Sequence, residues 1–145
     1  MKVLVQRVLS SSIIIKEEKV ASIGRGTLCL IGFEKGDSLD LCLRLLKRVV
    51  AYRMFSDNEG KMNLSLKDIE GDILLVPQVT LAINTRKGNR PSFSTSASPD
   101  ESRNLFEKIK IDFKEIFNSY QTGVFGEDMQ IELINEGPVT FMFET

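Results

Sequence analysis

The first segment that could carry chemistry is Pro77-Gln78-Val79-Thr80-Leu81, which sets two polar residues inside an otherwise apolar run. A proline within a central strand removes a backbone donor, which favours a bulge or an opening where main-chain groups can meet a ligand. The alternative is that Gln78 and Thr80 face solvent at the two-residue period of a strand. Taken by itself, the segment favours that alternative.

A second candidate is the segment Asn-Glu-Gly-Pro-Val-Thr at positions 135–140. Asn, Gly and Pro are the ordinary residues of turns, so composition alone favours a plain turn between two strands. Only about one X-Pro bond in twenty is cis in folded proteins. The composition therefore gives no ground for a cis peptide bond at Gly137–Pro138.

A third candidate is the polar segment 85–94, which contains Arg86, Lys87 and Arg90 and no acidic residue. Basic side chains beside glycine and hydroxyl groups can bind phosphate oxygens. Phe93 is able either to stack on a base or to anchor the segment, and anchoring is the favoured interpretation. The alternative for the whole segment is a solvated surface loop.

The chain has no histidine, which removes the commonest general base and every mechanism built on a Ser-His or Cys-His pair. Cys29 and Cys42 lie in apolar patterns without the paired spacing of a disulfide framework or a zinc site. They indicate buried thiols in a reducing compartment. We expect no metal and no cofactor.

A formal net charge of -1 provides no overall attraction to nucleic acid. Any RNA binding must therefore come from local basic segments. One is the 85–94 loop. The other lies in and just after a predicted helix and consists of Arg44, Lys47, Arg48 and Arg53.

The elements that must position these segments are predicted mainly as strands. With 145 residues, 42% of them hydrophobic, the chain forms one domain, residues 1–145. Alternating or continuous apolar patterns predict strands, with a hairpin-like connection before the last of them. Their expected ranges are 2–8, 11–16, 19–23, 27–33, 62–66, 73–83, 130–134 and 139–143.

Two helices are predicted between these strands. The first begins at Asp37-Ser38 and runs to about Tyr52, with apolar residues three or four apart. The second opens at Ser98-Pro99 with an N-cap, a proline in the first turn and acidic residues next to it. The expected fold class is α+β, a mostly antiparallel sheet or barrel covered by two helices. No apolar stretch is long enough to span a membrane, so we expect a cytoplasmic protein.

Eight segments, taken in order, resemble the D-aminoacyl-tRNA deacylase family over nearly the whole chain. They are VQRV at 5–8, GFEKGD at 32–37, GKMNLS at 60–65, TRKG at 85–88, RPSFS at 90–94, TGVFG at 122–126, MQ at 129–130 and NEGPVT at 135–140. Each motif is short, but their order and spacing make the resemblance specific.

The resemblance implies hydrolysis of the ester bond of D-aminoacyl-tRNA, and of mischarged glycyl-tRNA, with release of the free amino acid and tRNA. It implies a homodimer with a cross-subunit active site, in which a cis Gly137–Pro138 bond enters the partner's pocket. This element, which we call the Gly-Pro gate, rejects L-amino acids by steric clash. The ribose 2′-hydroxyl of the tRNA assists the reaction while main-chain groups orient it.

The resemblance also assigns the site residues. Gln78 and Thr80 are the catalytic candidates, Thr80 in a lining or orienting role. Arg86, Lys87 and Arg90 are expected to contact tRNA. The substrate pocket and the gate are assigned Pro77, Val79, Phe125, Met129, Asn135, Gly137, Pro138 and Thr140.

Pro77 is a departure, because the family's usual motif has serine at this position. Proline here is similar to a related branch that acts on tRNA mischarged with L-alanine and has a trans gate peptide. The segment at 135–140 instead follows the D-specific branch, which is the preferred reading. A tRNA-binding module without catalysis is the alternative from another class.

Overall fold

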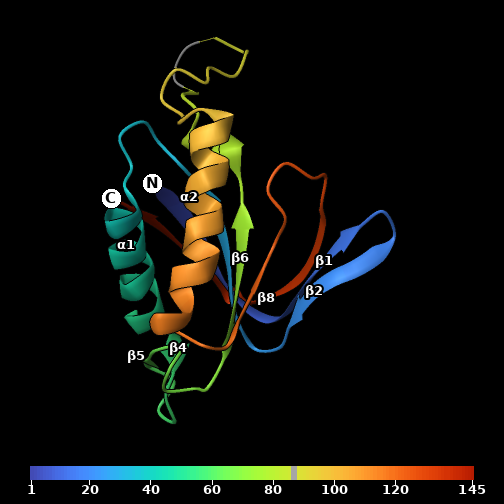
Figure 1. Ribbon diagram of the computed structural model, residues 1–145. Helices are drawn as coiled ribbons and strands as arrows, with labels where there is room; N and C mark the ends of the chain where they lie inside the picture. The colour runs from blue at the N-terminus through green and yellow to red at the C-terminus, as the bar shows by residue number, and fades with distance from the viewer. Residues whose placement is uncertain (86–87) are drawn as a thin grey trace.

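The strand β1 (Lys2–Ile15) organises the sheet because it pairs with three other strands, all of them antiparallel to it. Its first half pairs with β3 (Gly26–Gly32) and its second half with β2 (Glu18–Ile23). Its opposite edge pairs with β8 (Gln130–Glu144). This computed structural model describes residues 1–85 and 88–145 (Figure 1).

The sheet continues on the other side of β3 with two parallel strands. β6 (Asp72–Pro77) pairs with β3, and β7 (Tyr120–Thr122) pairs with β6. The result is a mixed sheet that curves into a nearly closed barrel, and the α+β class is confirmed. A separate short hairpin is formed by β4 (Phe55–Ser56) and β5 (Met62–Leu64).

Two helices, α1 (Leu39–Ala51) and α2 (Pro99–Asp112), lie next to each other against one face of the sheet (Figure 1). The main core fills the space beneath them. A smaller apolar cluster lies on the other side of the sheet, inside the barrel. Its buried members are Val8, Ile13, Ala21, Ile23, Leu28, Leu74 and Val76.

Both cysteines are free and buried, as their apolar surroundings predict. Burial raises the pKa of each thiol to about 12. They are inert core residues at neutral pH. Among the described residues, no helix is long and apolar enough to cross a membrane.

Both predicted helix starts are confirmed. Ser38 caps α1 by accepting a hydrogen bond from the Leu41 amide. Ser98 and Glu101 form a reciprocal capping box at the start of α2, with Pro99 in the first turn. The Ser98 side chain and amide hold the pKa of the Glu101 carboxyl below its usual range.

The strand predictions are wrong at three places in the chain, which involve five of the predicted ranges. The range 73–83 does not form one strand, because β6 ends at Pro77 and the short 3-10 helix η1 (Val79–Ala82) follows. The ranges 2–8 and 11–16 belong to one strand, β1. The ranges 130–134 and 139–143 are likewise one strand, β8, and the segment between them is no hairpin.

The reason for the last correction lies in the pairing. Both halves of β8 run antiparallel to β1, with Ile131 opposite Ile13 and Phe143 opposite Val3. A hairpin at 135–138 would reverse the chain direction, whereas here the direction is kept. The turn-forming residues are therefore used for a local excursion within a single strand.

Replacing Ser98 by alanine is expected to lower the free energy of unfolding by about 1 kcal/mol, because α2 loses the hydroxyl that accepts from its first turn. Urea denaturation measures this change. Ser22→Ala is the control, since Ser22 is exposed on β2 and its hydroxyl has no partner within residues 1–85 and 88–145. Equal stability of the two variants would contradict the capping role.

Candidate functional site

The polar pair after β6 lies in a turn rather than in a strand. Pro77 ends β6, and Gln78 still donates its amide to the Ile31 carbonyl before the chain enters η1. The Gln78 side-chain amide donates to Oγ1 of Thr80 at 2.5 Å. We call residues 77–80 the proline turn. It presents an exposed hydroxyl held by an amide.

No general base accompanies the Thr80 hydroxyl. In the described part of the chain, its only side-chain partner is the Gln78 amide, which donates to it and cannot take a proton. A threonine nucleophile needs an adjacent base. The geometry suits Thr80 for binding or orienting a group, not for attacking it.

Met129 lies beside the proline turn. A methyl group added at Gly123 would be 2.9 Å from Met129 Sδ and 3.2 Å from Pro77 Cδ. Gly123 therefore lies close to both side chains, and the strand end at Pro77 and the segment before β8 are neighbours. The structure therefore brings Pro77, Gln78, Thr80 and Met129 into one region.

Two other predicted pocket residues point into the core beneath the helices. The Phe125 ring is buried, and its centre lies 6.5 Å from the centre of the Phe106 ring. The Arg103 guanidinium carbon lies over the ring, 5.2 Å from its centre. Val79 packs at the edge of the same core. These two side chains support the region of the proline turn from behind.

The Gly-Pro gate is the centre of the excursion in β8. Gln6 pairs with Thr140 and Val8 pairs with Asn135, so residues 136–139 all stand opposite Arg7 alone. The Gly137–Pro138 peptide bond is cis, and both residues are exposed.

Glycine is required at position 137 of the gate. The φ of Gly137 is +139°, and an added Cβ would lie 2.7 Å from Val139 Cγ2 and 2.8 Å from the Val139 nitrogen. Asn135 closes the excursion, because its Oδ1 accepts from the Val139 amide at 3.1 Å. Asn135 thus braces the gate from the side.

Arg7 holds the base of the gate, a role that the sequence motifs did not indicate. Its Nε donates to the Glu136 carbonyl at 3.0 Å, and its Nη1 donates to the Met54 carbonyl at 2.6 Å. The Glu136 carboxylate lies 3.6 Å from the guanidinium. An available signal was the alternation of β1: Arg7 follows Val3 and Val5 on the buried face, and only 8% of it is exposed.

Within one chain, the gate and the proline turn are far apart. Met129 lies beside Pro77, whereas Gly137 is eight positions further along the extended strand β8. At ~3.3 Å per residue, and allowing for the excursion, the separation is roughly 20 Å. The predicted site residues therefore form two groups, one at each place.

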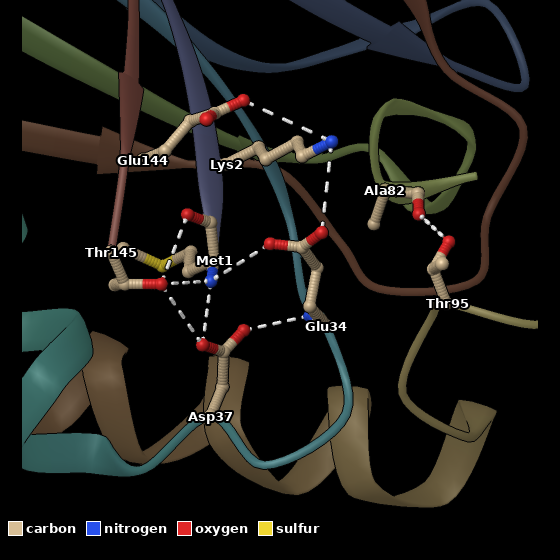
Figure 2. Close-up of polar contacts among 8 residues, drawn as sticks. All are labelled: Met1, Lys2, Glu34, Asp37, Ala82, Thr95, Glu144 and Thr145. Carbon is tan, nitrogen blue, oxygen red and sulfur yellow. Dashed lines mark hydrogen bonds and ion pairs between the residues drawn. The ribbon is translucent and has the colours of Figure 1, made fainter. Parts of the chain in front are cut away.

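The loop of residues 88–98 is fixed to η1 through Thr95. Thr95 donates its hydroxyl to the Ala82 carbonyl at 2.6 Å (Figure 2). The Thr95 carbonyl accepts from the Lys35 amide at 3.1 Å. The 34–37 segment is held in turn by the Met1 amine, which lies 2.5 Å from Asp37 and 3.5 Å from Glu34. Thr95 thus connects the loop to η1, the short helix that begins within the proline turn.

The anchoring prediction for Phe93 is wrong, because 57% of this residue is exposed and Thr95 fixes the loop instead. Arg90 is exposed in the same loop. Arg86 and Lys87 lie outside the described residues.

Comparison with known proteins gives a consistent result. A profile of the family described as D-Tyr-tRNA(Tyr) deacylase matches residues 4–144. The chain belongs to the D-Tyr-tRNA(Tyr) deacylase family. The D-aminoacyl-tRNA deacylase of Teredinibacter turnerae is 47% identical over 145 residues, all of both chains. That of Francisella tularensis subsp. novicida is 44% identical over 141 residues, 97% of each chain.

Two solved structures share the fold of this chain. The c-Myc DNA unwinding element binding protein is 30% identical and superposes with a TM-score of 0.91, over 100% of this chain and 99% of its own. A probable eukaryotic D-amino acid tRNA deacylase shares the fold at 19% identity, with a TM-score of 0.82 over 98% and 97% of the two chains.

In this member of the deacylase family, replacing Arg7 by lysine is expected to destabilise the fold by roughly 2 kcal/mol, because one ammonium cannot reach the same carbonyl groups as the guanidinium. Thermal or urea unfolding measures the loss. Arg25→Lys is the matched control, since Arg25 also faces Glu136 but is exposed, and little change is expected. Similar losses in both variants would refute a special role for Arg7.

Proposed function

We propose that this protein hydrolyses the ester bond between a D-amino acid, or glycine, and tRNA, releasing the free amino acid and the tRNA. The observation that carries the proposal is the family match over residues 4–144, together with full-length relatives named D-aminoacyl-tRNA deacylase. The reaction would remove wrongly charged tRNA before it is used in translation.

The chemistry we propose relies on positioning. The chain has no histidine, and Thr80 has no base among the described residues, so a side-chain nucleophile is disfavoured. Water attacks the ester carbonyl, the acyl bond to the ribose oxygen breaks, and that oxygen takes the proton. The neighbouring ribose 2′-hydroxyl assists, while Gln78 and the main chain of the proline turn orient the ester.

The Gly-Pro gate is proposed as the chiral filter. Its backbone is exposed and held on both sides, by Asn135 at Val139 and by Arg7 at Glu136. A fixed main-chain wall can exclude the side chain of an L-amino acid at Cα while leaving the opposite direction open. Because the wall contacts no particular side chain, it tolerates D-amino acids of many kinds.

The site requires two copies of the chain. The gate and the proline turn are both exposed and lie roughly 20 Å apart in one chain, which is too far for one substrate carbon to touch both. A twofold-related copy would bring the gate of one chain to the proline turn of the other, and the symmetry would make two equal sites.

An exposed apolar patch beside the gate supports this homodimer. Leu9, Leu133 and Ile134 are 48%, 36% and 58% exposed. They lie on the paired strands β1 and β8, next to the excursion. Exposed apolar side chains that lie close together are typical of a surface that a partner covers.

Contacts of Arg86, Lys87 and Arg90 with tRNA, lining of the pocket by Thr140, and a cytoplasmic location are also proposals. Arg90 is exposed, and Thr95 connects the loop that carries it to η1, which begins within the proline turn. A cation at that place would lie beside the substrate's RNA.

Pro77 favours one alternative activity, the release of L-alanine from mischarged tRNA. The proline ring, packed at Gly123 beside Met129, offers the substrate no hydroxyl. The two activities differ in substrate chirality, so one assay separates them.

The deciding experiment measures deacylation of D-tyrosyl-tRNA, L-tyrosyl-tRNA, glycyl-tRNA and L-alanyl-tRNA by the purified protein. We expect release from the D-tyrosyl and glycyl substrates at least about 100-fold faster than from L-tyrosyl-tRNA, a difference near 2.7 kcal/mol in activation free energy. Equal rates for the two tyrosyl substrates would refute the gate. Preferential cleavage of L-alanyl-tRNA would favour the rival, and binding without cleavage would indicate a non-catalytic module.

A charge within the apolar patch is expected to separate the two chains. Ile134→Glu should give a folded monomer in sedimentation and lose nearly all deacylation activity, because the gate no longer reaches a partner. Ile111→Glu is the control, since Ile111 is 63% exposed on α2. A monomeric Ile134→Glu variant with full activity would contradict the cross-subunit site.

A further inference from the structure

A row of basic residues lies on the exposed side of α1 and just after its end. Between residues 41 and 56 the chain has four basic residues and no acidic one. We call them the basic row: Arg44, Lys47, Arg48 and Arg53, all exposed. Asp40 is bound to Arg44 at 2.6 Å. Hydrogen bonds from Ser65, and also the charge of Arg53, lower the pKa of the Asp68 carboxyl. Arg48 and Lys47 have no such acidic partner within residues 1–85 and 88–145.

The other helix shows that this pattern is not a general property of the surface. The exposed side of α2 mixes both signs, with Asp100, Glu101 and Glu107 alongside Arg103 and Lys108. Since the whole chain has a net charge of -1, the basic row is a local concentration of positive charge.

The basic row contacts β8, the strand that carries the Gly-Pro gate. The Arg48 guanidinium lies 5.6 Å from the centre of the Phe143 ring, on the strand that carries the gate. Tyr52 follows Arg48 by four residues, and the centre of its ring lies 5.2 Å from that of Phe141 and 5.0 Å from that of Phe143.

The row ends at the support of the gate itself. Arg53 precedes Met54, whose carbonyl is bound by the same Arg7 guanidinium that binds the Glu136 carbonyl. Arg53 and Gly137 are therefore sequence neighbours of the two residues, Met54 and Glu136, that the Arg7 guanidinium joins. The end of the row and the base of the gate are thus linked through the buried side chain of Arg7.

We propose that the basic row binds the phosphate backbone of the tRNA acceptor arm, on the subunit that contributes the gate. This inference rests on the proposed function. If the gate of one chain enters the partner's pocket, the RNA attached to the bound amino acid emerges beside that gate, where the basic row begins.

The chemistry of the row fits an RNA backbone. Arg44, Arg48 and Tyr52 succeed one another at one-turn intervals of about 6 Å along the helix, giving repeated contacts to a linear polyanion. Lys47 has no hydrogen bond or ion pair within residues 1–85 and 88–145, so it is free to neutralise a phosphate. Tyr52, 37% exposed, adds a ring and a hydroxyl near the gate.

The test uses Lys47→Ala/Arg53→Ala in the full chain, with Lys108→Ala/Lys114→Ala as the control pair of exposed lysines. Steady-state deacylation is measured for D-tyrosyl-tRNA and for D-tyrosyl-adenosine, an ester without the RNA stem. We expect KM for the tRNA to rise about tenfold with little change in kcat. KM for the adenosine ester should be unchanged in both pairs.

Salt dependence provides an independent readout. Each lost phosphate contact should make the slope of log(1/KM) against log salt shallower by roughly 0.7 to 0.9 for the tRNA substrate, and the control pair should keep the wild-type slope. Loss of activity toward the adenosine ester as well would indicate damage to the site and would overturn the assignment. So would equal effects of the two pairs on KM for tRNA.

Failure of the proposed function would give a different result. If the wild-type protein cleaves none of the esters, the deacylase proposal fails, and direct binding of uncharged tRNA then tests the surface. Weaker tRNA binding in the Lys47/Arg53 variant alone would still support the basic row. Unchanged binding would overturn it.

Discussion

The buried guanidinium of Arg7 is the interaction on which the candidate site depends. It bonds two carbonyl groups that no strand ladder satisfies, those of Met54 and Glu136. Leaving such groups unpaired away from water is costly, so the arginine permits β8 to leave its ladder for four residues and to return. The same contact ties the end of α1 to the gate, which relates the helix, the sheet and the exposed Gly137–Pro138 backbone to one another.

What could be predicted from the sequence was local. The helix starts at Ser38 and Ser98 are determined by residues next to them in sequence, and both helices begin where those residues indicate. The buried cysteines followed from apolar surroundings in the same way. The family motifs also predicted the activity and the residues of the proposed site, but they assigned no role to Arg7.

What could not be predicted was decided by partners distant in sequence. The segment at 135–140 has the composition of a turn, and only the antiparallel pairing of both flanking halves with β1 makes it an excursion. The stop of β6 at Pro77 similarly depends on where β3 ends, since Ile31 is the last residue paired with it. Phe125 and Val79 have apolar side chains suited to a pocket wall, and tertiary packing turned both toward the core.

The arrangement of β1 and β8 has a consequence for how the protein is made. β1 is synthesised more than 100 residues before its longest partner, β8, which begins at Gln130. Pairing of Lys2 with Glu144 closes a loop of nearly the whole chain, a contact of the kind that slows folding. The gate therefore takes shape only after β8 has been made, and until then the edge of β1 that β8 will cover stays open to other strands.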